Sequence, residues 1–275
     1  MSFPANFDLE LPLLLDAIYQ RYHYDFRQYA RSTLKRRLAS AIDKFGCRSL
    51  SQLQDRLLHE PSVFPQLLDY LTVQLSDLFR DPAYFRAMRQ HVVPRLRTYP
   101  SLKIWVAGCS TGEEAYSFAI LLDEEGLLPR TLIYATDINP SALERAQSGR
   151  YEIDRMAGFT ENHRQAGGKG SLSDRYSAAY GGAVFDRQLR DRIVFSDHSL
   201  ATDSVFAEVN LVSCRNVLIY FDVELQNRAL GLFHDALPRK GILGLGAKET
   251  LRFSKYARSF SALAPSERIF QKETE

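Results

Sequence analysis

The sequence has few cysteines and no long apolar run, and each shortage excludes a class of protein. The three cysteines are Cys47, Cys109 and Cys214. Three cannot all pair within one chain, and the length does not suggest a disulfide scaffold, so a reducing cytoplasm fits best. No apolar run approaches the roughly 20 residues that span a bilayer, and the N-terminal residues lack the pattern of a secretory signal. We therefore expect a cytoplasmic protein without membrane insertion.

The chain also lacks a large excess of charge of either sign. Its net charge is +2 over 275 residues, which gives no case for nucleic-acid binding. The charge is uneven, however, because residues 21–44 hold seven Lys and Arg against two Asp. Such a stretch is either a patch for an acidic partner or a solvated helix face.

The first part of the chain has the periodicity of successive helices. Residues 31–45 place apolar side chains at the spacing of one helix face, namely Leu34, Leu38, Ala41, Ile42 and Phe45. Asp81 and Pro82 are typical of an N-cap and a first helical position, and they predict one helix to about residue 96. We therefore expect a helical domain with a linker helix over residues 1–95 and a second domain over 96–275.

From about residue 100 the pattern changes to alternating strands and helices, which is typical of a parallel α/β sheet. The polar, Gly-rich residues 150–190 interrupt this alternation. We expect an insertion there with its own small structure, or a lid. The expected strands lie within residues 102–108, 131–137, 192–197, 209–214, 241–249 and 267–272.

A Gly-rich turn over residues 108–112 joins the first strand to its helix, where many α/β proteins hold a phosphate. Glu113 and Glu114 begin that helix and would repel a phosphate. A ligand with an amino group fits better. Asp137 ends the second strand, where an acid often binds ribose hydroxyls. An amine plus a ribose without a pyrophosphate favours S-adenosylmethionine over NAD. Alternatively, the two glutamates only cap the helix and Asp137 is a turn residue.

Arg215 and Asn216 follow the buried strand at 209–214, at the end where α/β sheets bind ligands. An arginine and an asparagine are costly there unless a ligand or another group pairs with them. The alternative is a helix cap and a surface salt bridge.

Four stretches resemble one protein family in order and spacing. They are "LTVQLSDLFRDPAYF", "IWVAGCSTGEEAYS", "YATDINPSALERAQSGRY" and "CRNVLIYFD", and the chain resembles the CheR-type chemotaxis receptor methyltransferases from about residue 10 to 272. The resemblance implies an enzyme that uses S-adenosylmethionine, leaves S-adenosylhomocysteine, and esterifies receptor glutamates. It also implies a Rossmann-like methyltransferase sheet, a small N-terminal all-helical domain and an inserted small β-subdomain within residues 150–190.

The same resemblance implies roles for particular residues. Arg80 would lie near the cofactor carboxylate and the reaction centre, and Tyr220 near the methyl group. Glu114 would bind the methionine amino group, and Asp137 the ribose. The other implied cofactor-site positions are Gln74, Ser76, Gly108, Ser199, Leu200, Arg215 and Asn216.

Two stretches of the expected cofactor site depart from the family pattern. Many members have Asn-x-Thr ahead of Arg80, where this chain has Gln74 and Ser76; these side chains keep hydrogen-bonding capacity with altered geometry. Members often have Asn-Leu where this chain has Ser199 and Leu200, and the shorter hydroxyl would reach adenine only through a water.

A glutamate acceptor needs no general base, because it is already ionised at neutral pH. We therefore expect neither a catalytic triad nor a metal. Arg80 and Tyr220 would orient the acceptor carboxylate; their alternative roles are a domain-linking salt bridge and a half-buried core tyrosine. His198 lies near the expected adenine site, but a packed or surface histidine is the simpler interpretation. The histidines show no ligand-like clustering.

The basic helix would suit an acidic receptor surface. Lys35, Arg36 and Arg37 could dock against the Glu-rich helical bundle of a chemoreceptor's cytoplasmic region, and a monomer is the expected state. Two other functions remain open. One is a cofactor-binding regulatory module that has lost turnover, and the other is a methyltransferase for a different substrate, such as a small molecule.

Overall fold

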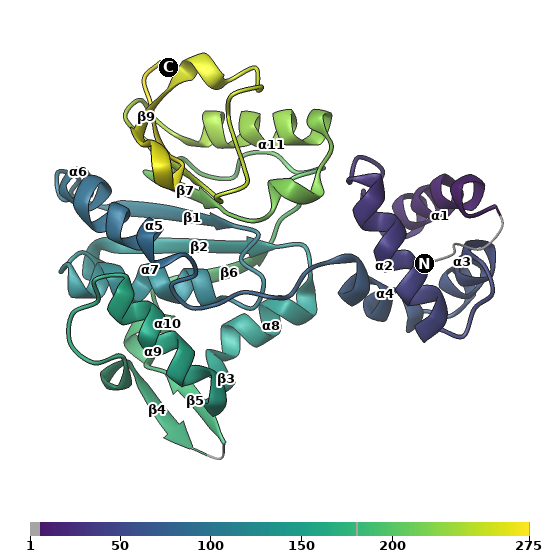
Figure 1. Cartoon of the computed structure of the whole chain (residues 1–275), viewed down its shortest axis with the longest axis horizontal. Helices are drawn as coiled ribbons and strands as arrows, with labels where there is room; N and C mark the ends of the chain where they lie inside the picture. Colours follow the sequence, from purple (N-terminus) through teal and green to yellow (C-terminus); the bar gives the residue numbers. More distant parts are fainter. Residues whose placement is uncertain (1–5, 180, 275) are drawn as a thin grey trace.

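The computed structural model describes residues 6–179 and 181–274. Four helices form a separate unit with its own apolar core, joined to the rest by a linker (Figure 1). In α2 the predicted face is buried, and Ser49 caps α3 by accepting a hydrogen bond from the Gln52 N–H at 3.2 Å. These helices are α1 (Phe7–Tyr22), α2 (Arg31–Lys44), α3 (Leu50–His59) and α4 (Val63–Leu71).

The linker helix predicted from Asp81 onward is divided into three parts. Asp81 occupies the N-cap position without a capping hydrogen bond from its side chain; its carboxylate instead binds Arg215. Pro94 has no N–H to donate one turn back, which accounts for the wider π turn just before it. The buried side chains of these three parts belong to the core that they share with the sheet. The parts are α5 (Pro82–Ala87), η1 (Met88–Val92) and α6 (Val93–Leu96).

The second unit is a seven-stranded mixed sheet in the order β6-β2-β1-β7-β8-β10-β9. The five strands from β6 to β8 run parallel, and β10 is antiparallel to both of its neighbours. This is the predicted Rossmann-like α/β fold. Of the last two strands, β10 was predicted from the sequence and β9 was not. The strands are β1 (Leu102–Ala107), β2 (Thr131–Asp137), β6 (Ile193–Asp197), β7 (Leu211–Cys214), β8 (Ile242–Leu245), β9 (Phe260–Ala264) and β10 (Ile269–Lys272).

Alternate residues of β1 enter two different cores, as the twofold period of a strand requires. Ile104 and Val106 pack in the core that includes α7 (Glu113–Glu124), whereas Trp105 and Ala107 pack in the core that includes α11 (Val223–Ala236). Both faces of β1 are therefore buried from Ile104 to Ala107, which explains why these four residues are all apolar.

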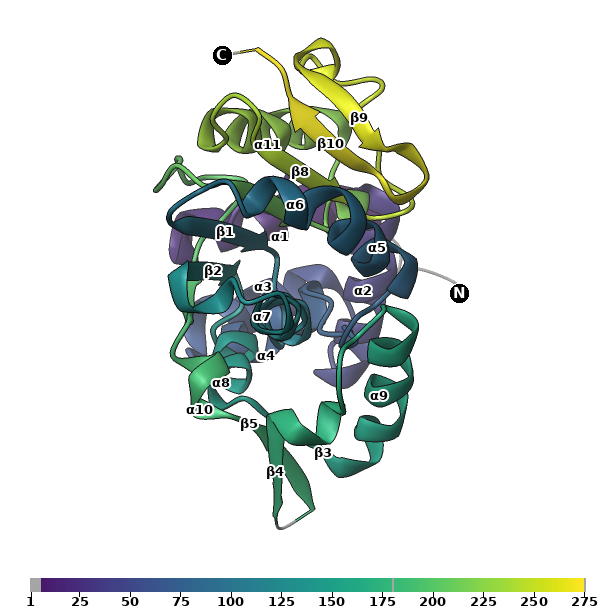
Figure 2. The same ribbon diagram turned by 90° about the vertical axis from the view of Figure 1, so that its left-hand side faces the viewer.

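The expected insertion is a small antiparallel β-sheet in the order β3-β5-β4, accompanied by a helix that the Gly-rich sequence did not predict. It lies at the end of the molecule opposite the C-terminal strands (Figure 2). Within the described ranges, no helix has the length and apolarity needed to cross a membrane. The insertion follows α8 (Pro140–Ser148) and comprises β3 (Arg150–Glu152), α9 (Met156–Gln165), β4 (Tyr176–Ala179), β5 (Gly182–Phe185) and α10 (Arg187–Arg190).

Candidate active site

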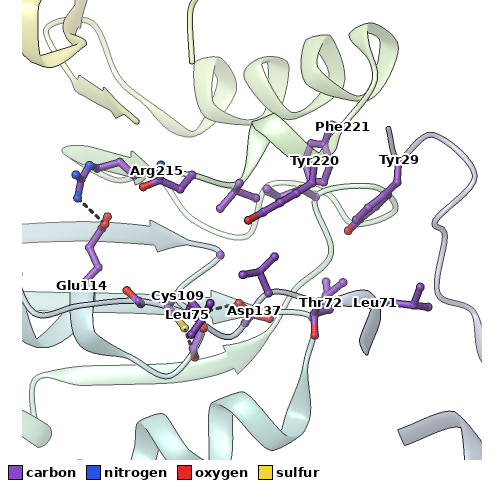
Figure 3. A pocket seen from close by; sticks show the side chains of 18 of the residues that line it. Tyr29, Leu71, Thr72, Leu75, Cys109, Glu114, Asp137, Arg215, Tyr220 and Phe221 are labelled. Carbon is purple, nitrogen blue, oxygen red and sulfur yellow. Dashed lines mark hydrogen bonds and ion pairs between the residues drawn. The ribbon is translucent and has the colours of Figure 1, made fainter. Parts of the chain in front are cut away.

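The carboxyl ends of three adjacent parallel strands meet at one cavity. Ala107 of β1 pairs with Thr136 of β2, and Val106 pairs with Ser213 of β7, so the three strands end at the same edge. A cavity of about 280 Å³ lies there (Figure 3). Of the predicted site residues, those that line it are Ser76, Arg80, Gly108, Glu114, Asp137, Leu200, Arg215, Asn216 and Tyr220.

The two glycines that bound the turn at residues 108–112 are required by packing within the protein. Gly108 has φ +75°, and a Cβ on it would lie 2.4 Å from Val217 Cγ2. Gly112 has φ +93°, and its Cβ would lie 2.8 Å from Ala146 Cβ. Any larger residue at these two positions would therefore have a strained backbone and would clash with Val217 or Ala146.

The two adjacent glutamates have different surroundings. Glu113 is fully buried, and its carboxylate accepts hydrogen bonds from Thr111 at 2.7 Å and Arg155 at 2.8 Å. Burial raises the pKa of the Glu113 carboxyl. Glu114 lines the cavity and accepts from Ser213 Oγ at 2.6 Å. Only Glu114 is therefore placed to meet a ligand, while Glu113 ties the helix to the inserted subdomain.

Arg215 holds the inner end of the cavity together. One guanidinium nitrogen donates to Glu114 at 2.8 Å, and the other donates to Asp81 at 2.7 Å and to the backbone oxygen of Arg80 at 2.9 Å. Its side chain is 1% exposed, and the guanidinium lies 4.0 Å from the ring centre of Tyr84. Two carboxylates thus surround one cation, which leaves this end of the cavity suited to a further positive group.

Arg80 is presented by a distorted backbone. Phe79 and Asp81, its two neighbours, have φ of +51° and +58°, which costs about 1–3 kcal/mol at each non-glycine position. The buried Phe79 N–H donates to Ser117 Oγ at 2.7 Å, and Arg215 braces the Arg80 carbonyl. Strain of this kind is held by surrounding contacts, and it keeps the half-buried Arg80 on the cavity wall.

Asp137 lies at the centre of the cavity lining, between Glu114 and the tyrosines of the other end (Figure 3). Its carboxylate accepts hydrogen bonds from the backbone N–H of Ser110 at 2.8 Å and of Asn139 at 3.0 Å. Burial nevertheless raises the pKa of the Asp137 carboxyl, and nearby Asp197 adds to the effect.

The helical unit contributes part of the cavity wall, which the sequence did not predict. Tyr29 and Thr33 line the cavity together with the α4 end at Leu71. Tyr29 forms an isolated antiparallel bridge with Phe221. Their rings pack edge to face, with 5.0 Å between the ring centres. The Ala30 N–H also donates to the Tyr220 carbonyl at 2.8 Å. The helical unit is therefore docked directly beside Tyr220.

A second connection, which we call the interdomain clamp, comprises Asp69, Thr72, Gln74 and Asn139. The buried Asn139 amide donates to Asp69 at 2.9 Å and to Thr72 at 2.8 Å, while its oxygen caps α8. Gln74 donates to Asp69 at 2.9 Å and accepts from Arg145. Gln74, expected in the cofactor site, therefore lies in the clamp and does not line the cavity.

Ser199, also predicted for the cofactor site, lies outside the cavity lining as well. It belongs to a local turn, where its side-chain oxygen accepts from the Ala201 N–H at 3.3 Å. The neighbouring His198 does line the cavity. Cys109 lines it too, but burial raises the pKa of its thiol well above the ordinary value, so it is not a thiolate nucleophile. Among the described residues, no cluster of three or more His, Cys, Asp or Glu could hold a metal.

The three basic residues predicted to dock a partner differ from one another. Lys35 forms an ion pair with Asp8 at 2.5 Å, and Arg36 is exposed. Arg37 is half-buried; it donates to the carbonyls of Tyr70 and Leu71 at 3.1 and 3.0 Å. Its guanidinium also lies 5.4 Å from the ring centre of Tyr220. Arg37 therefore contributes to the domain junction.

The sheet order, the Gly-rich turn after β1 and the cavity acids define a nucleotide-binding α/β domain of the methyltransferase type. Residues 74–266 match the model of the CheR methyltransferase SAM-binding domain, and residues 9–72 match that of the CheR methyltransferase all-alpha domain. The chain belongs to the CheR methyltransferase family. S-adenosylmethionine is accordingly its cofactor.

Relatives extend over nearly the whole chain. A Pseudomonas putida protein named as a candidate methyltransferase, Cher3, is 56% identical over 272 residues, which cover 99% of this chain and 100% of that protein. The chemotaxis protein methyltransferase of Salmonella typhimurium is 31% identical, with 92% and 87% covered. That of Listeria innocua is 31% identical, with 82% and 84% covered.

The cavity fits S-adenosylmethionine on several independent features. Glu114 offers a carboxylate for an ammonium group, and Asp137 offers one for ribose hydroxyls. Two buried oxygens of lining residues, Ser110 Oγ and Asn216 Oδ1, have no hydrogen-bond partner within the described chain. Such atoms are rare in the absence of a ligand or water.

Proposed function

We propose that this protein transfers a methyl group from S-adenosylmethionine to glutamate side chains of chemoreceptors, as a cytoplasmic protein-glutamate O-methyltransferase. One observation carries the proposal. The cavity that holds the acids suited to the cofactor, Glu114 and Asp137, also holds Arg80 and Tyr220, two donors suited to a carboxylate. Relatives named chemotaxis protein methyltransferases support a receptor as the acceptor.

Each cofactor group has a partner on the wall. Glu114, held by Ser213 and Arg215, would accept from the amino group. Asp137 would accept from the ribose hydroxyls. Asn216 would lie along the cofactor, where its side-chain oxygen has no hydrogen-bond partner among the described residues.

When bound, S-adenosylmethionine supplies a methyl group on a positively charged sulfur. An acceptor glutamate with an ordinary pKa of about 4.3 is a carboxylate at neutral pH, so the chain need not provide a base. Arg80 and Tyr220 would instead fix the direction of the carboxylate by hydrogen bonds. Positioning of this kind can contribute roughly 7–11 kcal/mol to catalysis.

The acceptor would reach the cavity beside the helical unit, because Tyr29 and Thr33 form part of its wall. Lys35 and Arg36 lie on the same helical unit and would attract a Glu-rich receptor bundle. Exposed charges of this type mainly change the rate of encounter.

The test is transfer of a labelled methyl group to a purified receptor cytoplasmic fragment. Label released as methanol by mild alkali identifies an ester, and receptor variants with Glu→Gln changes at the accepting positions should lose it. Alkali-stable label would contradict glutamate as the acceptor. Binding of S-adenosylhomocysteine without transfer to any receptor fragment would favour a regulatory module, and transfer only to a metabolite would favour a small-molecule enzyme.

A further inference from the structure

Residues 215–217, which we call the wall loop, follow β7 and form one side of the cavity. This loop has an unusual backbone, since Asn216 has φ +61°. Val217 packs so closely against the turn after β1 that Gly108 has no room for a Cβ. The backbone of the wall loop therefore needs a further support besides the contact between Val217 and Gly108.

The carboxylate of Glu249 provides that support. Its Oε1 accepts from the Val217 N–H at 2.8 Å, and its Oε2 accepts from the Asn216 N–H at 3.1 Å and the Gly246 N–H at 2.6 Å. Glu249 is only 4% exposed and does not line the cavity. A buried carboxylate is costly unless several donors converge on it, and here the donors come from two loops.

We propose that Glu249 is the positioning residue of the cofactor site, which holds the wall loop so that Arg215 and Asn216 face the cofactor. Glu249 acts through the backbone and touches neither cofactor nor acceptor. The proposal rests on the cofactor alone and not on which acceptor is methylated, so it can fail or succeed independently of the proposed receptor reaction.

The geometry requires two acceptor oxygens. An amide at this position keeps one oxygen and turns a nitrogen donor toward at least one backbone N–H, because all three N–H groups converge on the two carboxylate oxygens. Gly246 is part of the same arrangement. A Cβ there would lie 2.7 Å from Glu249 Oε2 and 2.8 Å from the Asn216 nitrogen.

The test compares Glu249→Gln with Glu208→Gln, which makes the same chemical change at an exposed position. Calorimetric titration with S-adenosylhomocysteine should show at least about tenfold weaker binding for E249Q and no change for E208Q. In methyl transfer, the KM for S-adenosylmethionine should rise more than kcat falls. Glu249→Asp, which keeps both oxygens, should recover part of the affinity.

A purely structural role predicts a different result. E249Q would then unfold at a lower temperature, yet the folded protein would bind S-adenosylhomocysteine as the wild type does, and that outcome overturns the proposal. If E249Q does not fold, folded Glu249→Asp takes its place, because its shorter side chain cannot reach all three N–H groups as Glu249 does. Binding weaker than in the wild type supports the proposal, and wild-type binding refutes it.

Discussion

The guanidinium of Arg215 donates to the carboxylate of Glu114 at 2.8 Å, with 1% and 12% of these side chains exposed. The pair fixes the orientation of the acid at the inner end of the cavity. Because Asp81 also binds Arg215, the cation is shared between two carboxylates. Glu114 can therefore be held rigidly by Arg215 and still attract the amino group of the cofactor.

Glu113→Gln and Glu114→Gln should separate the two adjacent acids. E114Q should weaken S-adenosylhomocysteine binding about tenfold or more, because a charged hydrogen-bond acceptor is lost from the cavity. E113Q should instead lower the free energy of unfolding by about 1–3 kcal/mol, since Arg155 loses its buried ionic partner. Calorimetric titration and denaturant unfolding measure the two effects. Equal loss of cofactor affinity in both variants would contradict this division.

Binding of S-adenosylhomocysteine should weaken at acidic pH because of Asp137. Burial raises the pKa of this carboxyl above its ordinary value of about 4, so the carboxylate is protonated at a higher pH than a free aspartate. The protonated form is a poorer acceptor for ribose hydroxyls. Titrations between pH 8 and pH 5, at the lower end of which the protein is checked for folding, should show this loss of affinity. Asp137→Asn should bind weakly throughout and lose this pH dependence.

The same raised pKa has the opposite sign for folding. Ionisation of a carboxyl whose folded-state pKa is raised costs free energy, so the contribution of Asp137 to stability is largest below its ordinary pKa and is lost as the pH rises through the raised value. Acidification should therefore remove the free-energy cost that ionised Asp137 imposes on the folded apoprotein, while it weakens cofactor binding. The contribution of Asp137 to stability and to cofactor affinity is the difference between the wild type and D137N at each pH. If acidification lowers both differences together, this assignment is wrong.

The strand ends of the site were predictable because the period of apolar residues fixes where a strand stops. Asp137 and Arg215 follow such runs, and parallel strands bring their ends to one edge. The division between Glu113 and Glu114 was not predictable. Adjacent helix positions point about 100° apart, and which of them faces the cavity depends on how α7 packs against the sheet.

Contacts between the two units could not be inferred from local patterns. Tyr29 reaches the cavity only because the helical unit docks beside Phe221, and no periodicity within α1–α4 records that docking. Asn139 caps α8, but its second contact needs Asp69 from 70 residues earlier. Gln74 was assigned by resemblance to the cofactor, whereas its longer side chain reaches Arg145.

Asn139→Asp should open the interdomain clamp while keeping the cap on α8, because aspartate is also a good N-cap. The new carboxylate would face Asp69, which now accepts from the Asn139 amide. We expect weaker S-adenosylhomocysteine binding and faster proteolysis within residues 72–80. Asn139→Ser, which caps without adding charge, should have a smaller effect. Wild-type proteolysis and affinity in N139D would show that the clamp does not hold the units together.

Charge reversal at two neighbouring residues of α2 should distinguish docking from domain packing. Arg36 is exposed, so Arg36→Glu should raise the KM for a receptor fragment about fivefold, equivalent to about 1 kcal/mol for a surface charge, and leave S-adenosylhomocysteine binding unchanged. Arg37→Glu should impair both, because it removes donors to Tyr70 and Leu71 and a cation beside Tyr220. Steady-state kinetics at two salt concentrations, with calorimetric titration, measures both effects. The R36E effect should shrink at high salt; weakened cofactor binding in R36E would remove this face of α2 from the docking surface.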